Sequence, residues 1–109
     1  MKREYEDRTE YYNELGQVHR EHDLPAIEYK NGNKCWCING KIHRENDLPA
    51  VEDIDGYKEW RINGKRHREN GPAVEYYNRK SYYLNDNLLF KDEYEEELIK
   101  IKLNRLKNI

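Results

Sequence analysis

Residues 43–52 read HRENDLPAVE, and two other stretches of the chain repeat this phrase almost letter for letter. HREHDLPAIE begins at His19 and HRENGPAVE begins at His67, so the three copies start 24 residues apart. Repetition at a fixed period of this size is typical of arrays in which each unit packs on its neighbours. The chain of 109 residues therefore predicts a single domain, residues 1–109, built from about three 24-residue units.

Turn signals recur inside each unit. Asn-Gly follows each Trp by three residues, at 39–40 and 63–64. A second turn signal lies after each Pro-Ala pair, with Gly at 31–32 and 55–56 and in the weaker form Asn-Arg at 78–79. Asn-Gly and Asp-Gly between β-prone runs are the strongest local signals for a type I′ hairpin turn. The sequence predicts a mainly β fold, an antiparallel β-meander of repeated hairpins over residues 11–90. We expect seven or eight short strands, among them 50–54 and 58–62.

Alternation along these strands assigns side chains to the two faces of the sheet. Aromatic residues recur at Tyr12, Trp36, Trp60 and Tyr82, and one predicted inner ladder joins each of the last three to an aliphatic residue two positions later. A second ladder holds the β-branched residues after Pro-Ala, and the charged residues opposite are expected in water. The first ladder pairs Trp36 with Ile38, Trp60 with Ile62 and Tyr82 with Leu84, and the second contains Ile27, Val51 and Val74. The residues expected in water are Glu28, Glu52, Glu75, Glu59 and Arg61.

Residues 91–109 predict a C-terminal α-helix that caps the open end of the sheet. Asp92 followed by Glu95 matches an N-cap with its reciprocal acidic partner. Acidic residues in the first turns and basic residues in the later turns complement the helix macrodipole. One apolar side is expected to cover the sheet, and an adjacent side is either buried in the chain or meets a partner, including a second copy in a homodimer. The side expected to cover the sheet consists of Tyr94, Leu98, Ile101 and Ile109. The adjacent side consists of Ile99, Leu103 and Leu106.

The composition narrows the classes of function. The chain carries 20 Lys and Arg against 22 Asp and Glu, so its net charge of −2 gives no overall attraction to nucleic acid or to an anionic membrane. No segment has the roughly 20 apolar residues of a membrane span, and residues 1–10 lack the apolar core of a signal peptide. Cys35 and Cys37 share a predicted strand face, where a strained disulfide is disfavoured, so we expect reduced thiols in a cytoplasmic protein.

Residues 60–75 read WRINGKRHRENGPAVE, with an aromatic residue, Asn-Gly, a basic residue, His-Arg and Pro-Ala in turn. This pattern resembles the MORN repeat and its variants, and looks most like a repeat found in proteins of bacteriophages and large DNA viruses. The resemblance spans Tyr11–Leu84. It implies a β-hairpin repeat sheet used for binding or assembly, without catalysis, in a virus-encoded protein of the host cytoplasm.

Two interpretations of the His-Arg pairs are open at this stage. In the first, each Arg pins its loop to nearby carboxylates by charge-assisted hydrogen bonds, and each His bonds loop carbonyls. In the second, the guanidiniums form a stripe, with His and Lys beside it, that binds an acidic partner or a phosphorylated ligand. Tyrosines on the sheet offer another surface, because Tyr and Arg are frequent interface hot spots. The predicted binding residues are Arg20, Arg44, Arg68, His43, His67, Lys41, Lys65, Tyr29 and Tyr76.

No metal or cofactor is expected. Equivalent residues of neighbouring units lie two strands, about 9–10 Å, apart, so His19, His43 and His67 cannot ligate one ion at about 2.0–2.1 Å. A zinc site made from Cys35, Cys37 and a neighbouring His is the alternative, although it lacks the usual spacing of zinc-binding Cys pairs. No nucleophile with a base and no phosphate-binding loop is recognisable, so no enzymatic activity is predicted.

The sequence as a whole predicts a non-enzymatic binding module with a protein partner. It would bind and block or sequester a host component, as an antagonist of host defence does, through the Arg/His edge or the Tyr-rich face. One alternative is capture of a small phosphorylated ligand such as a nucleotide by Arg44, Arg68, Lys41 and Lys65. The other is a structural assembly role mediated by the C-terminal helix.

Overall fold

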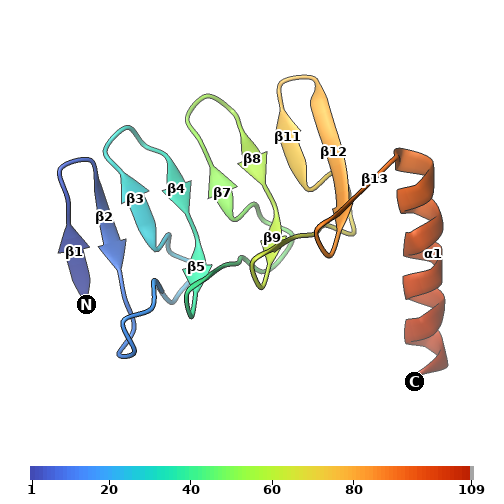
Figure 1. Ribbon diagram of the computed structural model, residues 1–109, viewed down its shortest axis with the longest axis horizontal. Helices are drawn as coiled ribbons and strands as arrows, with labels where there is room; N and C mark the ends of the chain where they lie inside the picture. Colours follow the sequence, from blue (N-terminus) through green and yellow to red (C-terminus); the bar gives the residue numbers. More distant parts are fainter. Residues whose placement is uncertain (109) are drawn as a thin grey trace.

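The computed structural model describes residues 1–108, which form a row of β-hairpins followed by one helix (Figure 1). The large sheet contains β1 (Lys2–Glu4), β2 (Arg8–Tyr11), β3 (Ile27–Tyr29), β4 (Lys34–Cys35), β7 (Val51–Glu52), β8 (Lys58–Glu59), β11 (Val74–Tyr76), β12 (Arg79–Leu84) and β13 (Asn87–Leu89), hydrogen-bonded side by side in that order. Two separate hairpins consist of β5 (Cys37–Ile38) with β6 (Lys41–Ile42) and β9 (Arg61–Ile62) with β10 (Lys65–Arg66), and α1 spans Lys91–Lys107. All strand pairs are antiparallel, so the predicted mainly β meander is confirmed.

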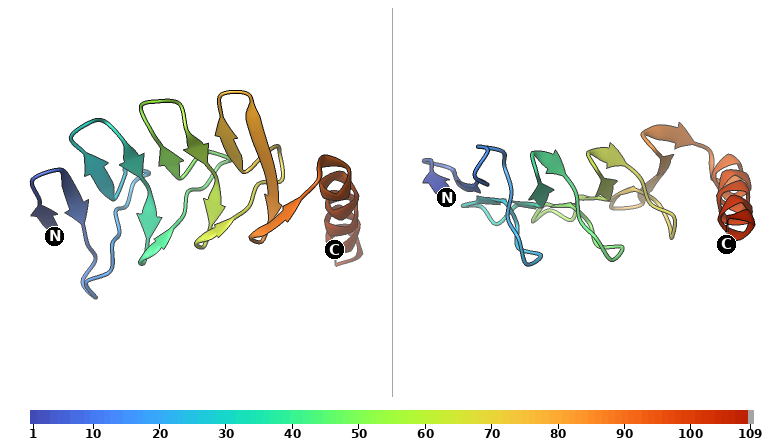
Figure 2. Two further views of the ribbon diagram at one scale, coloured as in Figure 1. Left: turned by 45° about the horizontal axis from the view of Figure 1, so that its top comes forward. Right: turned by 90° about the horizontal axis from the view of Figure 1, so that it is seen from below.

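Each repeat unit makes two hairpins, and the chain divides between them at a tryptophan. The backbone N–H of Trp60 donates to Ala73 O of the next unit at 2.8 Å, with β8 before it and β9 after it. The short hairpins bend out of the plane of the large sheet (Figure 2). The predicted strand 58–62 is therefore two strands, and β1 and most of β2 lie before residue 11, where the β region was predicted to begin. Residues 1–108 consequently hold thirteen strands rather than seven or eight. The predicted strand 50–54 contributes only β7, because the following residues form a turn.

The turns of the two hairpin types differ in geometry. At 39–40 the Asn and Gly have φ of 50° and 81°, and at 63–64 the values are 51° and 82°, as a type I′ turn requires. In the large sheet, Gly32 has a φ of 100° and donates its N–H to Tyr29 O at 2.9 Å, while the preceding Asn has a negative φ. The type I′ prediction was therefore wrong at 31–32 and at 55–56, where a three-residue loop ends in Gly.

The core is thin and continuous along the array. Ala26, Ala50 and Ala73 are fully buried, and Trp36 and Trp60 are nearly so. A small cluster forms where Ala26 meets both cysteines, and four half-buried aliphatic side chains pack against it: Val18, Ile27, Ile42 and Val51. Because the molecule measures 46 × 36 × 19 Å, no unit encloses a core alone and each depends on its neighbours.

Two predictions about the faces were wrong. Ile38 and Ile62, expected in the inner ladder, are 36% and 37% exposed, because they lie on the short hairpins beyond the covered tryptophans. Glu59, expected in water, is only 5% exposed. Its carboxylate accepts hydrogen bonds from Tyr57 Oη at 2.7 Å, from Arg66 Nε at 3.0 Å and from Arg61 Nε, which explains how a charge is tolerated there.

The first unit also departs from the predicted alignment. The backbone N–H of His19 donates to Tyr11 O, as that of His43 donates to Trp36 O and that of His67 to Trp60 O. Tyr11, rather than Tyr12, therefore occupies the tryptophan position. The reason is a turn at Asn13–Gln17 that is one residue longer than its counterparts.

The helix α1 packs on β12 and β13, and its N-cap lies two residues before the predicted one. The N-cap is Phe90, whose backbone N–H donates to Glu93 Oε1 at 3.0 Å, so the prediction of Asp92 with Glu95 was wrong. Tyr94 is buried against the sheet, with its ring 4.9 Å from that of Tyr82. The three residues of the second apolar side, Ile99, Leu103 and Leu106, are exposed, and Ile109 lies outside the described residues.

Candidate functional site

The structure defines one recurring corner, the His-Arg corner, which comprises residues 19–25, 43–49 and 67–72. In each corner the guanidinium lies flat over an aromatic ring of the same unit. The Cζ of Arg44 is 3.7 Å from the centroid of the Trp36 ring, and that of Arg68 is 3.8 Å from the Trp60 ring. This arrangement covers the tryptophans and adds a cation–π attraction.

Each guanidinium is also anchored within its own unit. Arg44 Nη1 donates to Pro49 O at 3.0 Å and to Glu52 Oε1 at 3.4 Å. Arg20 makes the equivalent bonds to Pro25 O at 3.2 Å and to Glu28 at 3.0 Å. In the third corner, Arg68 donates to Pro72 O at 3.1 Å and lies 3.6 Å from Glu75. The Arg therefore holds the loop against the strand that follows, as the first interpretation of the His-Arg pairs requires.

An aspartate of the preceding unit completes the binding of two of these guanidiniums. Arg44 donates through Nε and Nη2 to the two carboxylate oxygens of Asp23, at 2.9 and 3.3 Å. Arg68 binds Asp47 in the same way, at 2.9 and 3.4 Å. Our sequence analysis missed both aspartates, although Asp stands at the same place in two copies of the phrase and is absent from the third.

The histidines tie each corner to the next short hairpin. His43 Nδ1 accepts the backbone N–H of Asn63 at 2.9 Å, and its Nε2 lies 2.6 Å from Glu45 Oε1. His67 repeats both contacts, with Asn85 at 3.0 Å and with a Glu at 3.1 Å. The expectation that His bonds loop carbonyls was wrong, because the ring nitrogen faces a turn amide of the next unit.

The two predicted lysines lie apart from the guanidiniums, on the short hairpins. Lys41 pairs with Ile38 across β5 and β6, and Lys65 pairs with Ile62 across β9 and β10. Both side chains are exposed, and within residues 1–108 neither forms an ion pair. The fold therefore separates the predicted Arg stripe from the predicted Lys residues.

The tyrosines gather at the ends of the large hairpins, on a surface we call the tyrosine strip: Tyr29, Ile54, Tyr57, Tyr76 and Tyr77. The Tyr57 and Tyr76 rings are 6.0 Å apart, and the Tyr76 and Tyr77 rings are 4.4 Å apart. The Ile54 side chain also packs closely against the backbone of the turn at Gly32, where a Cβ atom would lie only 2.7 Å from Ile54 Cγ2. The strip therefore extends toward β3. The sequence analysis singled out Tyr29 and Tyr76 but missed Tyr77 and Ile54, which expose 76% and 68% of their surface.

The hydroxyl groups of Tyr57 and Tyr76 stay protonated at neutral pH. Burial, together with the hydrogen bond to Glu59, raises the pKa of Tyr57 to about 12. The hydrogen bond with Tyr77, aided by burial and by Asp55, raises the pKa of Tyr76 to about 12. These two side chains therefore present neutral rings with hydrogen-bonding hydroxyls.

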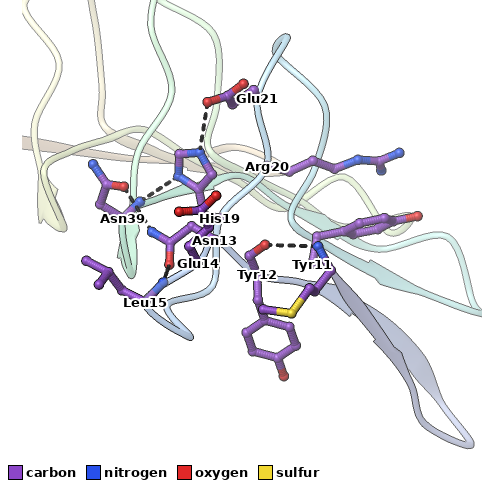
Figure 3. Close-up of a pocket in the computed structure, with 10 residues that line it drawn as sticks. Tyr11, Tyr12, Asn13, Glu14, Leu15, His19, Arg20, Glu21 and Asn39 are labelled. Carbon is purple, nitrogen blue, oxygen red and sulfur yellow. Dashed lines mark hydrogen bonds and ion pairs between the residues drawn. The ribbon is translucent and has the colours of Figure 1, made fainter.

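Three hollows of the same kind lie along the His-Arg corners. Two of them, of about 250 and 340 Å³, lie between neighbouring units and contain Trp36 and Trp60. The third, of about 680 Å³, lies at the β1 end of the array and contains Tyr11, His19 and Arg20 (Figure 3).

The cysteines form a buried pair rather than a ligand set. Cys35 Sγ and Cys37 Sγ are 3.8 Å apart, and both thiols are free. The contact with Cys37 and burial raise the pKa of the Cys35 thiol, so it stays protonated. Within residues 1–108, no three His, Cys, Asp or Glu side chains are placed to hold a metal ion, so no third ligand for the zinc alternative is found there.

No protein-family model, no curated protein and no solved structure matches this chain significantly. Over residues 1–108, the one helix is too short and too polar to cross a membrane.

Proposed function

We propose that this chain is a non-enzymatic protein-binding module that contacts its partner through the tyrosine strip. One contrast carries the proposal. The guanidiniums of Arg44 and Arg68 are occupied by carboxylates of the chain itself, whereas Ile54 and Tyr77 expose most of their surface and Tyr29 is 37% exposed.

The chemistry of the strip suits a protein interface. Tyrosine brings a large rigid surface at a low cost in conformational entropy, together with a hydroxyl for hydrogen bonding. Such residues dominate interface energetics when they lie on a rigid scaffold. Here the scaffold is a hydrogen-bonded sheet, since Tyr76 pairs with Arg79 and Tyr29 with Arg8 across neighbouring strands.

The backbone at Tyr77 supports the same proposal. Its φ is +54°, which is an unusual conformation for a large side chain and costs free energy. Asn or Gly would relieve this strain at an exposed turn. A strained and exposed tyrosine at a hairpin tip is consistent with a role in recognition rather than in stability.

The resemblance of the repeat to viral sequences extends the proposal to a host protein as the partner, bound in the cytoplasm of the infected cell. Capture of a phosphorylated ligand by Arg44, Arg68, Lys41 and Lys65 stays a prediction. The geometry favours it less, because both guanidiniums already bind carboxylates and both lysines lie on other hairpins.

Site-specific photocrosslinking tests the proposal. A photoreactive phenylalanine analogue at position 77 should crosslink one protein in the natural host, whereas the same analogue at Lys65 should not. The captured protein, purified, should bind the wild-type chain and lose at least about tenfold in affinity with Tyr77→Asn. Asn tolerates the positive φ, so this variant removes the ring without adding backbone strain.

A matched control is Lys102→Gln, which changes an exposed residue of α1 far along the chain from the strip. Equal crosslinking from positions 65 and 77, or unchanged affinity for Tyr77→Asn, would contradict the proposal.

A further inference from the structure

The three arginines of the His-Arg corners differ in one respect. Arg44 and Arg68 each direct Nε and Nη2 at an aspartate of the preceding unit. Arg20 makes the same bonds through Nη1, to Pro25 O and to Glu28, but within residues 1–108 no carboxylate meets its Nε and Nη2. Its guanidinium lies 3.7 Å over the Tyr11 ring, so it is held in the same orientation as the other two.

A hollow lies where the missing aspartate would be. Arg20 and Tyr11 line the hollow of about 680 Å³ at the β1 end, which is larger than its two counterparts between units. In Figure 3 the Arg20 side chain extends beside the Tyr11 ring, away from His19. The Arg20 side chain is half-buried and already held in one orientation. Its Nε and Nη2 face solvent, which a ligand could displace.

Within residues 1–108, neither aspartate of the two internal pairs is free to fill this place, because Asp23 and Asp47 are already bound. The other end of the array also lacks the equivalent aspartate, because Gly71 stands in its place and α1 covers the last strands. There Tyr94 covers Tyr82, and Arg105 binds Glu69 through two hydrogen bonds of 2.6 Å.

We propose that Arg20 and Tyr11 form a docking site for a single carboxylate of a partner protein, presented by a peptide segment that is otherwise uncharged. The two internal pairs show the geometry, with Nε and Nη2 donating to the two oxygens of one carboxylate. Glu28 already neutralises part of the Arg20 charge, and Glu14 and Glu21 line the same hollow. These charges favour a monoanionic carboxylate over a phosphate dianion.

This site is independent of the tyrosine strip, because it lies on the His-Arg corner of the first unit rather than at the hairpin ends. The test is an NMR titration of the whole chain, observing the arginine Nε–H signals. The first probe is acetyl-His-Asp-Leu-Pro-amide, which copies residues 22–25 and carries one side-chain carboxylate. The second has Asn for Asp and a free C-terminal carboxylate, and the third is inorganic phosphate.

We expect a saturable shift of the Arg20 Nε–H signal with the first or the second peptide, and the responding peptide identifies the source of the carboxylate. The Arg44 and Arg68 signals should not move, because internal aspartates occupy them. Arg20→Gln should weaken binding by about tenfold or more, as the loss of a charge-assisted pair does. Arg79→Gln, an exposed arginine of β12, should leave it unchanged.

The absence of an Arg20 shift with both peptides would overturn the proposal, as would an equal or stronger response to phosphate. Unchanged peptide binding by Arg20→Gln would do the same. If that variant does not fold, the titration of the wild-type chain decides the matter alone. Signals of Tyr77 report on the strip separately, so failure here is distinguishable from failure of the proposed function.

Discussion

Asp23 and Arg44 stand 21 residues apart in the sequence, yet their side chains form a two-point ion pair across the boundary between two repeat units. Asp47 and Arg68 repeat the same pair one unit further on. Each Arg also covers a buried tryptophan, and each Trp indole N–H donates to the backbone carbonyl of the same aspartate, at 3.1 and 3.0 Å. These corners therefore join neighbouring units through side chains, in addition to the backbone pairing of the large sheet.

Replacing Asp47 should weaken the contact between the second and third units. Asp47→Asn removes the charge that Arg68 meets, while keeping the size of the side chain. Because Asp47 is 37% exposed, solvent screens the pair, and we expect the free energy of unfolding to fall by about 1 kcal/mol. Urea unfolding followed by tryptophan fluorescence measures this change.

The control for that experiment is Glu96→Gln, which removes the same charge from an exposed position of α1 without an ion pair in residues 1–108. Equal stability of Asp47→Asn and Glu96→Gln would show that the corner pair adds nothing to the stability of the array.

His43 should act as a hydrogen-bond acceptor for the next turn. His43→Ala leaves the Asn63 N–H without its acceptor near a buried position, which should cost about 1–3 kcal/mol of unfolding free energy. His43→Asn should recover part of the loss, because its Oδ1 lies close to the position of the ring Nδ1. Thermal unfolding of the three proteins, with the exposed His22→Asn as control, tests the order. A fully stable His43→Ala would refute the role.

Docking of the helix should depend on pH. The hydrogen bonds from Arg105, helped by His67, lower the pKa of Glu69 to about 2 from 4.5. A carboxyl group whose pKa is lower in the folded state stabilises the fold above its unfolded pKa, and this contribution is lost as the pH falls. The stability difference between wild type and Arg105→Gln should therefore be full above pH 4.5 and shrink toward pH 2.

Urea unfolding at a series of pH values measures this difference. Lys102→Gln loses the same charge from an exposed part of the helix and should show no such pH dependence. A difference between wild type and Arg105→Gln that stays constant from pH 5 to pH 2 would mean that Glu69 and Arg105 do not pair in solution.

The two thiols should react slowly in the folded protein. Cys35 and Cys37 are buried, and the raised pKa of Cys35 keeps its reactive thiolate scarce. We expect labelling by a soluble thiol reagent to be at least about tenfold slower than in the urea-unfolded chain, because it requires local opening. Cys35→Ser and Cys37→Ser single variants assign the two rates. Immediate labelling of either thiol would argue against the packing of the first two units.

Local rules were sufficient to predict much of the architecture. The repeated phrase at a spacing of 24 residues predicted stacked hairpins, and the Asn-Gly pairs at 39–40 and 63–64 predicted turns with positive φ. The charge pattern predicted the helix, although its cap was misplaced. These features depend on residues close together in the chain, where backbone sterics and periodicity act directly.

The candidate sites could not be predicted in the same way, because they depend on contacts between residues that are far apart in the sequence. Asp23 meets Arg44, and Ile54 meets the tip at Gly32, because stacking places residues of successive units side by side. The one-residue insertion near Asn13 placed Tyr11, rather than Tyr12, beneath Arg20. The phrase HRENDLPAVE thus determined a repeating corner. The three-dimensional packing determined which arginines the chain itself neutralises, since that depends on whether a preceding unit supplies a carboxylate within hydrogen-bonding distance.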